Sequence, residues 1–254
     1  MTNYDKWCEP SKVTHIDAHA IDVLVSSSDE VGIATLAAHL PSRYAETKAL
    51  TRIAERFGKI QVSKFLQNKI PATQSARSGD LGEILATAFL EEDCGHVVGP
   101  SRLIQRDHQE WAMRGDDVLG ARLDSSSRVH LIKGEAKSRA QTRTAAVTEA
   151  RDGLQRTDGL PSPHSLTQFA ERLLDTLDDD LGEKILELLL VEGIRPDGVT
   201  HLMFLFTGND PISHVKADLV AYRGGIKQRA VILRVQAHQD FVRTVYERAI
   251  SDGS

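Results

Sequence analysis

Residues 116–137 consist of two β-rich runs, DDVLGARL and RVHLIKGEAK, separated by the turn-forming stretch DSSS. Two β-rich runs around a short cluster of turn formers are typical of a β-hairpin. The second run ends with a carboxylate and an ammonium group, Glu135 and Lys137, after residues that read as buried. Charges in a buried strand are costly unless they are paired or have a function. The hairpin therefore predicts a local fold and also a pair of charges that needs an explanation.

The segments around the hairpin predict a mixed α/β fold with a central mixed sheet flanked by helices. Residues 79–93, GDLGEILATAFLEED, carry apolar side chains at helical spacing, so a helix precedes the hairpin. Its predicted apolar face consists of Leu81, Ile84, Leu85, Ala88 and Phe89. Apolar runs of strand length and amphipathic helices follow the hairpin. The runs cover 200–208 and 229–237, and the helices cover 144–155, 166–177, 182–193 and 240–250.

The chain has 254 residues and is 41% hydrophobic, which is enough to bury one large core with an appendage. We predict a mostly helical N-terminal region over 1–75 that begins with an early strand at 15–25, HIDAHAIDVLV. The remaining region, 76–254, contains the hairpin and a helical insertion around 164–192.

Several classes of protein have no support in the sequence. No apolar stretch has the length of a membrane span, and the first residues, MTNYDKWCEPSK, lack the apolar core of a signal peptide, so we expect a cytoplasmic protein. Cys8 and Cys94 are far apart and form no Cys-x-x-Cys pair, which indicates neither a disulfide framework nor a zinc knuckle. The motifs of serine hydrolases, P-loop ATPases and dinucleotide-binding enzymes are absent.

Charge is distributed unevenly along the chain. The net charge of -5 argues against tight binding of nucleic acid by overall electrostatics alone. Residues 43–77 hold eight Lys or Arg and two Glu, whereas residues 171–192 hold eight Asp or Glu and two basic residues. The first segment is suited to meet phosphate and the second is not. For both segments a solvated helix face is the alternative interpretation.

The predicted hairpin brings charged residues to one place. By the period-two rule, Lys133, Glu135 and Lys137 lie on one face of the second strand. Asp116 and Asp117 stand where the first strand begins, and in an antiparallel pair that position lies beside the end of the second strand. An Asp and a Glu that converge with a backbone carbonyl offer the hard oxygen ligands that Mg²⁺ prefers. A lysine beside them would hold the attacking water and offset charge on phosphorus oxygens.

This order of residues resembles the core of the PD-(D/E)xK nucleases. The resemblance is carried by Asp117, by Glu135-Ala136-Lys137 eighteen residues later, and by the helix GDLGEILATAF before them. It implies a restriction-endonuclease-like core that hydrolyses DNA phosphodiester bonds with Mg²⁺ or Mn²⁺. It also implies that Asp117, Glu135 and the carbonyl of Ala136 hold the metal ion and that Lys137 positions the nucleophile. The alternative is that Glu135 and Lys137 form a surface pair on an edge strand.

Two acidic residues keep alternative roles. Asp116 is the alternative metal ligand to Asp117, because either residue of the GDD stretch also fits a turn into the strand. Glu83 is implied by the resemblance as a catalytic residue that contacts the metal through water. Asp80 with Glu83 also fits an acidic capping box at the start of a helix, so the capping role stays open.

Three stretches together, SGDLGEILATAFL, RGDDVLGARLD and LIKGEAKSR, resemble the nuclease subunits of Hachiman anti-phage systems, the HamA family. This resemblance implies a DNA-cleaving effector that works beside a superfamily-two helicase, HamB. It further implies that the nuclease is held inactive until invading or damaged DNA engages the helicase. The alternatives are a catalytically silent subunit that binds nucleic acid or acts as a scaffold, and a stand-alone restriction endonuclease.

A weaker metal-binding pattern lies near the N-terminus. In HIDAH, the residues His15, Asp17 and His19 would alternate onto one face of the predicted strand, where they could bind a transition metal. Asp22, a possible further ligand, falls on the other face. Scattered structural histidines are the favoured interpretation.

Overall fold

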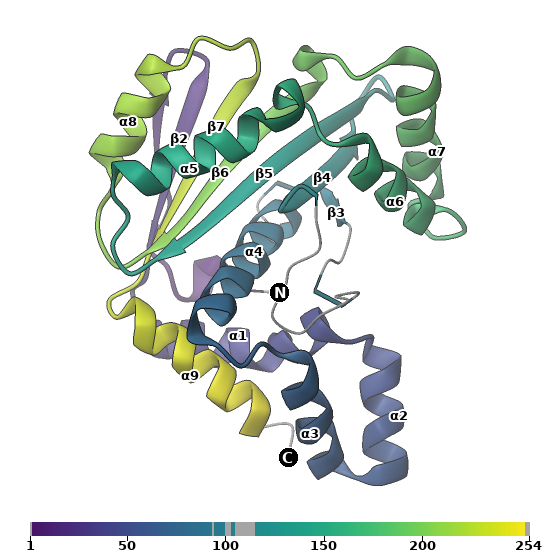
Figure 1. Cartoon of the computed structure of the whole chain (residues 1–254), viewed down its shortest axis with the longest axis vertical. Helices are drawn as coiled ribbons and strands as arrows, with labels where there is room; N and C mark the ends of the chain where they lie inside the picture. The colour runs from purple at the N-terminus through teal and green to yellow at the C-terminus, as the bar shows by residue number, and fades with distance from the viewer. Residues whose placement is uncertain (1, 93, 100–102, 105–114, 252–254) are drawn as a thin grey trace.

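The computed structural model describes residues 2–92, 94–99, 103–104 and 115–251 (Figure 1). The strands are β1 (Lys12–Ile16), β2 (His19–Val25), β3 (Val97–Gly99), β4 (Val118–Leu123), β5 (Val129–Arg139), β6 (Val199–Thr207) and β7 (Lys227–Arg234). The α-helices are α1 (Asp29–Tyr44), α2 (Thr47–Phe57), α3 (Lys59–Lys69), α4 (Gln74–Glu92), α5 (Thr144–Gln155), α6 (Pro163–Leu173), α7 (Asp179–Glu187), α8 (Ile212–Ala221) and α9 (His238–Ser251). Short helical turns are η1 (Tyr4–Lys6), η2 (Arg156–Gly159), η3 (Leu188–Glu192) and η4 (Pro196–Gly198).

These strands form one sheet in the order β1-β2-β7-β6-β5-β4-β3. The four strands β2, β7, β6 and β5 are parallel, and β1, β4 and β3 join antiparallel at the two sides. Every residue of β6 is buried, which fits a parallel strand covered on both faces. The predicted mixed α/β class with a central mixed sheet is confirmed.

The predicted hairpin is also confirmed. β4 and β5 pair antiparallel from Leu123 opposite Val129 to Val118 opposite Gly134. Asp124 stabilises the turn, because its carboxylate accepts hydrogen bonds from two backbone N–H groups of the turn and from the side chain of its last residue. This is the local chemistry that makes Asp and Ser frequent in turns.

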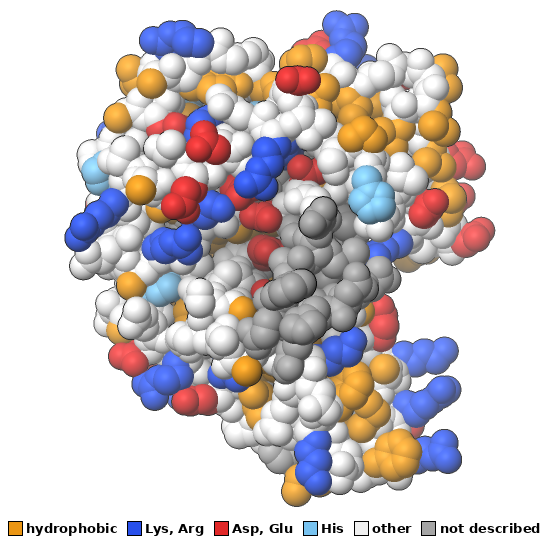
Figure 2. All heavy atoms as spheres, in the orientation of Figure 1, with side chains coloured by type: hydrophobic (Ala, Val, Ile, Leu, Met, Phe, Trp, Pro, Cys, Tyr) orange, Lys and Arg blue, Asp and Glu red, His pale blue; other side chains and the backbone are white. Residues whose placement is uncertain are grey.

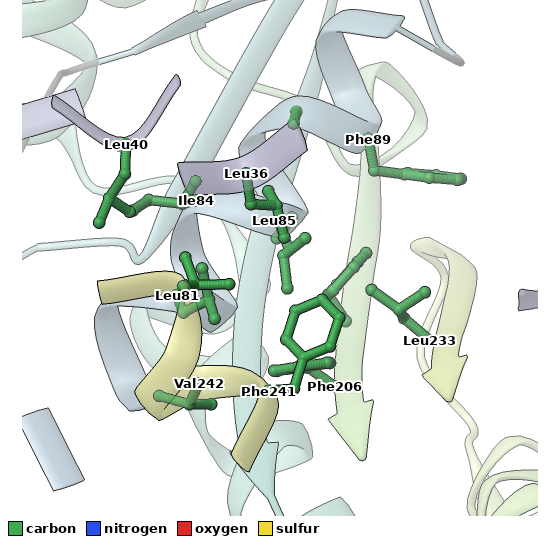
Figure 3. Packing of buried hydrophobic residues seen from close by; sticks show 14 of the residues in the cluster. Leu36, Leu40, Leu81, Ile84, Leu85, Phe89, Phe206, Leu233, Phe241 and Val242 are labelled. Atoms are coloured by element: carbon green, nitrogen blue, oxygen red, sulfur yellow. The ribbon is translucent and has the colours of Figure 1, made fainter. Parts of the chain in front are cut away.

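Helices cover both faces of the sheet (Figure 1). α1, α4 and α9 pack on one face, and α5 and α8 pack on the other. The predicted apolar face of α4 lies in the first of these cores, where its leucines approach Phe206 of β6 and Phe241 of α9 (Figure 3). Each such buried side chain contributes about 1.5–3 kcal/mol. The apolar face that anchors α4 therefore fixes this helix against the end of the hairpin.

The N-terminal segment differs from the prediction of a single early strand over 15–25. It forms two antiparallel strands, β1 and β2, that turn at Asp17, whose φ of 51° lies in the left-handed region that Asp tolerates better than most residues. β2 then pairs in parallel with β7. The N-terminal strands therefore extend the sheet that carries the hairpin. The division of the chain between residues 75 and 76 stays a prediction, and that position falls in the first turn of α4.

The segment from α6 through η3 lies beside β4 and the start of β5 (Figure 1). It corresponds to the helices predicted around 164–192. Ser162 caps α6, because its hydroxyl accepts a hydrogen bond from the N–H of Ser165, and Pro163 takes the first helical position. Among the helices in the described ranges, none combines the length and apolarity that crossing a membrane requires.

Candidate active site

Two carboxylates meet where the hairpin ends. Asp117 directly precedes β4, and Glu135 follows Gly134 in β5. Because Val118 pairs with Gly134, the next residues outward, Asp117 and Glu135, lie side by side. Burial raises the pKa of the Glu135 carboxyl, and the negative charge of Asp117 raises it further. The fold thus holds the Asp117 carboxylate close enough to raise the pKa of Glu135.

Lys137 completes this group. Its Nζ donates a hydrogen bond of 2.6 Å to Oε1 of Glu135, and this contact opposes the rise in the pKa of the Glu135 carboxyl. The two side chains are 18% and 8% exposed. β5 lies between β4 and β6 in the sheet. Beyond Gly134, β5 pairs among the described strands with β6 alone, but the low exposure of both side chains argues against a surface pair.

Gly153 of α5 provides the space for Glu135. A Cβ atom at Gly153 would overlap the carboxylate of Glu135, so any other residue at that position would force the Glu135 side chain to move. Glycine inside a helix costs about 1 kcal/mol relative to alanine, and such a glycine commonly has a packing reason. Sequence reasoning missed Gly153, although its place within the helical pattern TAAVTEARDGLQ was a usable signal.

Lys133, the first charged residue of β5, has a structural partner. Its side chain is 2% exposed, and its Nζ lies 3.7 Å from Oδ1 of Asp116. The other carboxylate oxygen of Asp116 accepts a hydrogen bond of 2.7 Å from the backbone N–H of Ser162, which begins α6. These contacts join the hairpin to α6. Asp116 and Asp117 thus make different contacts although they are adjacent in the chain.

Lys133 also fixes the turn that follows α5. Its Nζ donates to the carbonyl oxygens of Arg156 at 2.5 Å and Leu160 at 3.0 Å. Between them, Thr157 and Asp158 both have positive φ, a conformation that costs about 1–3 kcal/mol for each non-glycine residue. The side chain of Arg156 is exposed, and its positive charge acts to lower the pKa of Glu135. Sequence reasoning did not identify Arg156, since only the tertiary structure brings it to this place.

Glu83 lies on α4, the helix that precedes the hairpin. Glu83 and Asp117 line one pocket of about 130 Å³ between α4, α1 and the β3–β4 pair. Arg43 at the rim forms an ion pair of 2.8 Å with Glu91. Glu135 is not among the residues that line this pocket. Figure 2 shows acidic and basic side chains close together near the middle of one face of the molecule.

The capping role considered for Asp80 and Glu83 is wrong. α4 begins at Gln74, so both residues lie inside the helix rather than in its first turn. Asp80 is buried and accepts a hydrogen bond of 2.5 Å from the hydroxyl of Tyr44. Gly82, between Asp80 and Glu83, allows α4 to approach β5 closely. A Cβ at Gly82 would lie 3.2 Å from Cβ of Ser138.

A buried polar chain supports β5 on its other face. The hydroxyls of Ser78 and Ser138 are 2.7 Å apart, and Oγ of Ser138 lies 2.9 Å from Nε2 of His238. Burial, aided by the charge of Arg139, lowers the pKa of His238 to about 4, so this imidazole is neutral near pH 7. These contacts tie α4 and α9 to the residue that follows Lys137.

Comparison with known proteins identifies the family of this chain. A sequence model of the HamA family matches residues 2–249. The chain belongs to the HamA family. A curated relative, the Hachiman protein HamA of Bacillus cereus, is 27% identical over 190 residues, which cover 72% of this chain and 68% of that protein. The family resemblance inferred from the three short stretches is thereby confirmed.

In this HamA family member, the hairpin end fits a hard divalent cation. Burial raises the pKa of the Glu135 carboxyl, and the charge of Asp117 adds to that rise. A site of one or two carboxylates completed by carbonyl, water and phosphate oxygens is typical for Mg²⁺. The described ranges contain no group of three or more His, Cys, Asp or Glu residues placed to hold a metal ion. The donors that the described residues bring together here are two carboxylates and the neighbouring backbone carbonyl, not a larger cluster of side chains.

The N-terminal histidines form no such site within the described part of the HamA chain. His15 is exposed on β1, while Asp17 stands in the turn. Nδ1 of His19 accepts a hydrogen bond of 3.2 Å from the backbone N–H of Gln228 on β7. The structural interpretation of these histidines stays a prediction.

Proposed function

We propose that this chain is a metal-dependent DNA endonuclease that acts as the effector of a Hachiman anti-phage defence system. The observation that carries the proposal is the group at the hairpin end, where Asp117, buried Glu135 and Lys137 lie together. Membership of the HamA family supports the defence role. The same arrangement of helix, hairpin and following helix supports the likeness to PD-(D/E)xK nucleases.

Each group has a distinct task in phosphodiester hydrolysis. Asp117, Glu135 and the carbonyl of Ala136 would hold Mg²⁺ or Mn²⁺. When bound, the cation supplies Lewis-acid polarisation of the phosphate and lowers the pKa of water. Lys137, already oriented by its hydrogen bond to Glu135, would hold the attacking water and offset negative charge on the phosphorus oxygens.

The contacts around the site favour Asp117 over Asp116 as the ligand. The Asp116 carboxylate contacts Lys133 and the start of α6, whereas Asp117 faces Glu135 and shares a pocket with Glu83. Glu83 would then contact the metal through water from the α4 side. Arg156, exposed near Glu135, is suited to hold a phosphate of the substrate.

Supercoiled plasmid tests this function directly. The purified chain, alone and with its helicase, should nick or linearise plasmid in the presence of Mg²⁺. Sequence-specific fragments without a partner would instead identify a stand-alone restriction endonuclease. If both the chain alone and the complex bind DNA without cleaving it, the result would support the alternative of a catalytically silent subunit.

Replacing Gly153 with alanine is expected to lower plasmid cleavage by about 10²-fold, because a displacement of about 1 Å in a catalytic group has effects of this size. The added methyl group would push the Glu135 carboxylate from its position. Overpacking costs about 1–3 kcal/mol, and the better helix propensity of alanine offsets about 1 kcal/mol of it. Initial rates of nicking, together with chemical denaturation, measure both effects.

Gly79→Ala is the matched control for Gly153→Ala. Gly79 also lies within a helix, α4, but a Cβ there would meet no atom within 4 Å. This variant should keep the wild-type rate. Equal rates for Gly153→Ala and the wild type would show that the position of Glu135 against α5 is not needed for cleavage.

The acidic segment 171–192 is the proposed contact for the helicase partner. Its described structure exposes three large apolar side chains, Leu177, Leu190 and Val191, among the carboxylates. Their exposures of 104%, 80% and 80% are higher than those of the other exposed apolar residues of the described chain. An apolar patch with an acidic rim fits a basic protein surface, since complementary charge steers and registers such encounters.

Reversing Glu183 and Glu192 to lysine is expected to weaken co-purification with the helicase by tenfold or more, on the order of the effect of charge pairs at interfaces. Asp178, Asp179 and Asp180 are less suitable targets, because they form the start of α7. Asp240→Lys with Glu247→Lys on α9 is the charge-matched control. If co-purification is unchanged in the Glu183 and Glu192 variant, the acidic segment is not the contact for the helicase.

A further inference from the structure

Residues 47–69, which form α2, the turn at Gly58 and α3, make up a projection that we name the basic arm. The arm holds six Lys or Arg and a single acidic residue, Glu55. In α2, Lys48, Arg52 and Arg56 follow one another at intervals of four residues, so they form one row along the helix, with a rise of about 6 Å between neighbours. A single-signed row of this kind creates a local positive surface on a chain whose net charge is -5.

These cations are not neutralised by the rest of the described chain. Lys48, Arg52 and Arg56 are exposed, as are Lys59 and Lys64 of α3. None of these five forms an ion pair with another described residue. Within that part of the chain they therefore remain available for an external anion.

The arm also carries apolar side chains that the fold leaves uncovered. α2 has no buried residue, although it is a regular helix. At the turn, Phe57 and Ile60 are each 61% exposed, and the guanidinium of Arg56 lies 5.5 Å from the centre of the Phe57 ring. Phe57 and Phe65 line an open groove together with the row of cations. A groove that combines basic residues with aromatic rings is the common design of surfaces that bind single-stranded nucleic acid.

The basic arm continues from the candidate site. Two residues separate the end of α1 from the start of α2. Ser42 and Arg43 of α1 line the pocket that contains Glu83 and Asp117. α3 anchors the arm to the body, because Oγ of Ser63 donates a hydrogen bond of 2.7 Å to the carbonyl of Ile250. Figure 1 shows α2 and α3 projecting at the lower right, and Figure 2 shows Lys, Arg and apolar side chains on that projection.

We propose that the basic arm binds a single-stranded segment of the DNA substrate beside the cleavage site. Lys48, Arg52 and Arg56 contact successive phosphates, and Phe57 stacks on an unpaired base at the end of the row. This inference rests on the proposed nuclease function and specifies the form of DNA that the chain takes. Single-stranded segments are what a helicase partner produces, so the arm gives the complex a way to cut only DNA that is being unwound.

The test uses the full chain carrying Lys137→Ala, in EDTA, so that binding is measured without cleavage. Fluorescence anisotropy with labelled oligo(dT) and with a labelled blunt duplex is recorded across a range of salt. Arg52→Glu with Arg56→Glu should weaken oligo(dT) binding by about tenfold or more and lower the salt slope by about 0.7 for each phosphate that the arm no longer binds. Lys216→Glu with Arg223→Glu, an equal charge change on and beside α8, should have little effect.

Variants of Phe57 test whether the arm recognises single-stranded DNA by base stacking or binds any DNA by charge alone. Phe57→Ala should weaken oligo(dT) binding by roughly 5- to 100-fold, the range expected for removal of one stacked base, and leave duplex binding unchanged. Phe57→Tyr should restore the affinity, because the ring is retained. Equal decreases on oligo(dT) and duplex, or no decrease on either, would overturn the assignment of single-stranded DNA.

The outcomes also distinguish the arm from the nuclease function. If the arm variants bind oligo(dT) normally while Glu135→Ala alone abolishes cleavage, the proposed DNA-binding role of the arm is wrong and the proposed nuclease function is supported. If they bind DNA normally but no longer co-purify with the helicase, the arm is a protein contact and the proposal is overturned. Absence of oligo(dT) binding by the parent protein even at low salt would equally overturn it.

Discussion

Alanine at Glu135 or at Lys137 is expected to lower the rate of plasmid cleavage by about 10²-fold or more, the size of effect seen when one preorganised electrostatic interaction with a transition state is removed. Glu135→Ala removes a proposed metal ligand, and Lys137→Ala removes the group that orients the attacking water. Initial rates of nicking at saturating Mg²⁺, measured with the helicase present, give both values.

The controls separate chemistry from folding. Glu135 and Lys137 form a largely buried pair, so removal of one partner also leaves an uncompensated charge. Glu135→Gln and Lys137→Met keep the volume of each side chain and should be as inactive as the alanine variants. Glu149→Ala breaks the exposed ion pair with Arg139 and should keep full activity. If folded Glu135 and Lys137 variants cut plasmid at the wild-type rate, the active site lies elsewhere.

Removal of divalent cations with EDTA is expected to abolish cleavage, and Mg²⁺ or Mn²⁺ should restore it. Ca²⁺ should support DNA binding with little hydrolysis, because its looser coordination positions water poorly. Asp117 and Glu135 are the proposed metal ligands, so Asp117→Asn should raise the Mg²⁺ concentration needed for half-maximal activity. Cleavage rates across a titration of each metal provide the measurement.

His15→Ala with His19→Ala is the control for metal identity. Neither histidine lies in a metal-binding group of the described chain, so this variant should respond to Mg²⁺ as the wild type does. Two results would contradict the proposal: full activity in chelator, or a strict need for Zn²⁺ that disappears in the histidine variant.

The parts of the site that could be predicted depend on contacts between residues close in sequence. The turn formers at 124–127 and the alternating pattern on either side determine the β4–β5 pairing, and that pairing places Asp117 beside Glu135. Helical spacing likewise identified the buried face of α4. The prediction failed for the segment 15–25, where a two-residue turn inside an otherwise strand-like pattern produces β1 and β2 instead of one strand.

Other parts could not be predicted because their partners are distant in sequence. Lys133 and Glu135 have the same periodicity and similar neighbours, yet one binds Asp116 and the turn after α5, while the other faces Asp117. Glycine at position 153 has a role only because α5 crosses β5 there. A sequence pattern identifies which face a side chain occupies, but not which element covers that face.

By itself, the sequence determined the mixed α/β class, the hairpin, the grouping of one Asp with Glu135 and Lys137, and the resemblance to the HamA family. All of these depend on short-range periodicity or on residues in a fixed order. The tertiary structure decided which charges are paired within the protein and which remain available to a ligand. Whether a charge is paired depends on its burial and on the opposite charges that elements distant in sequence bring to it. A charge in a protein core is stable only where the fold brings it a partner.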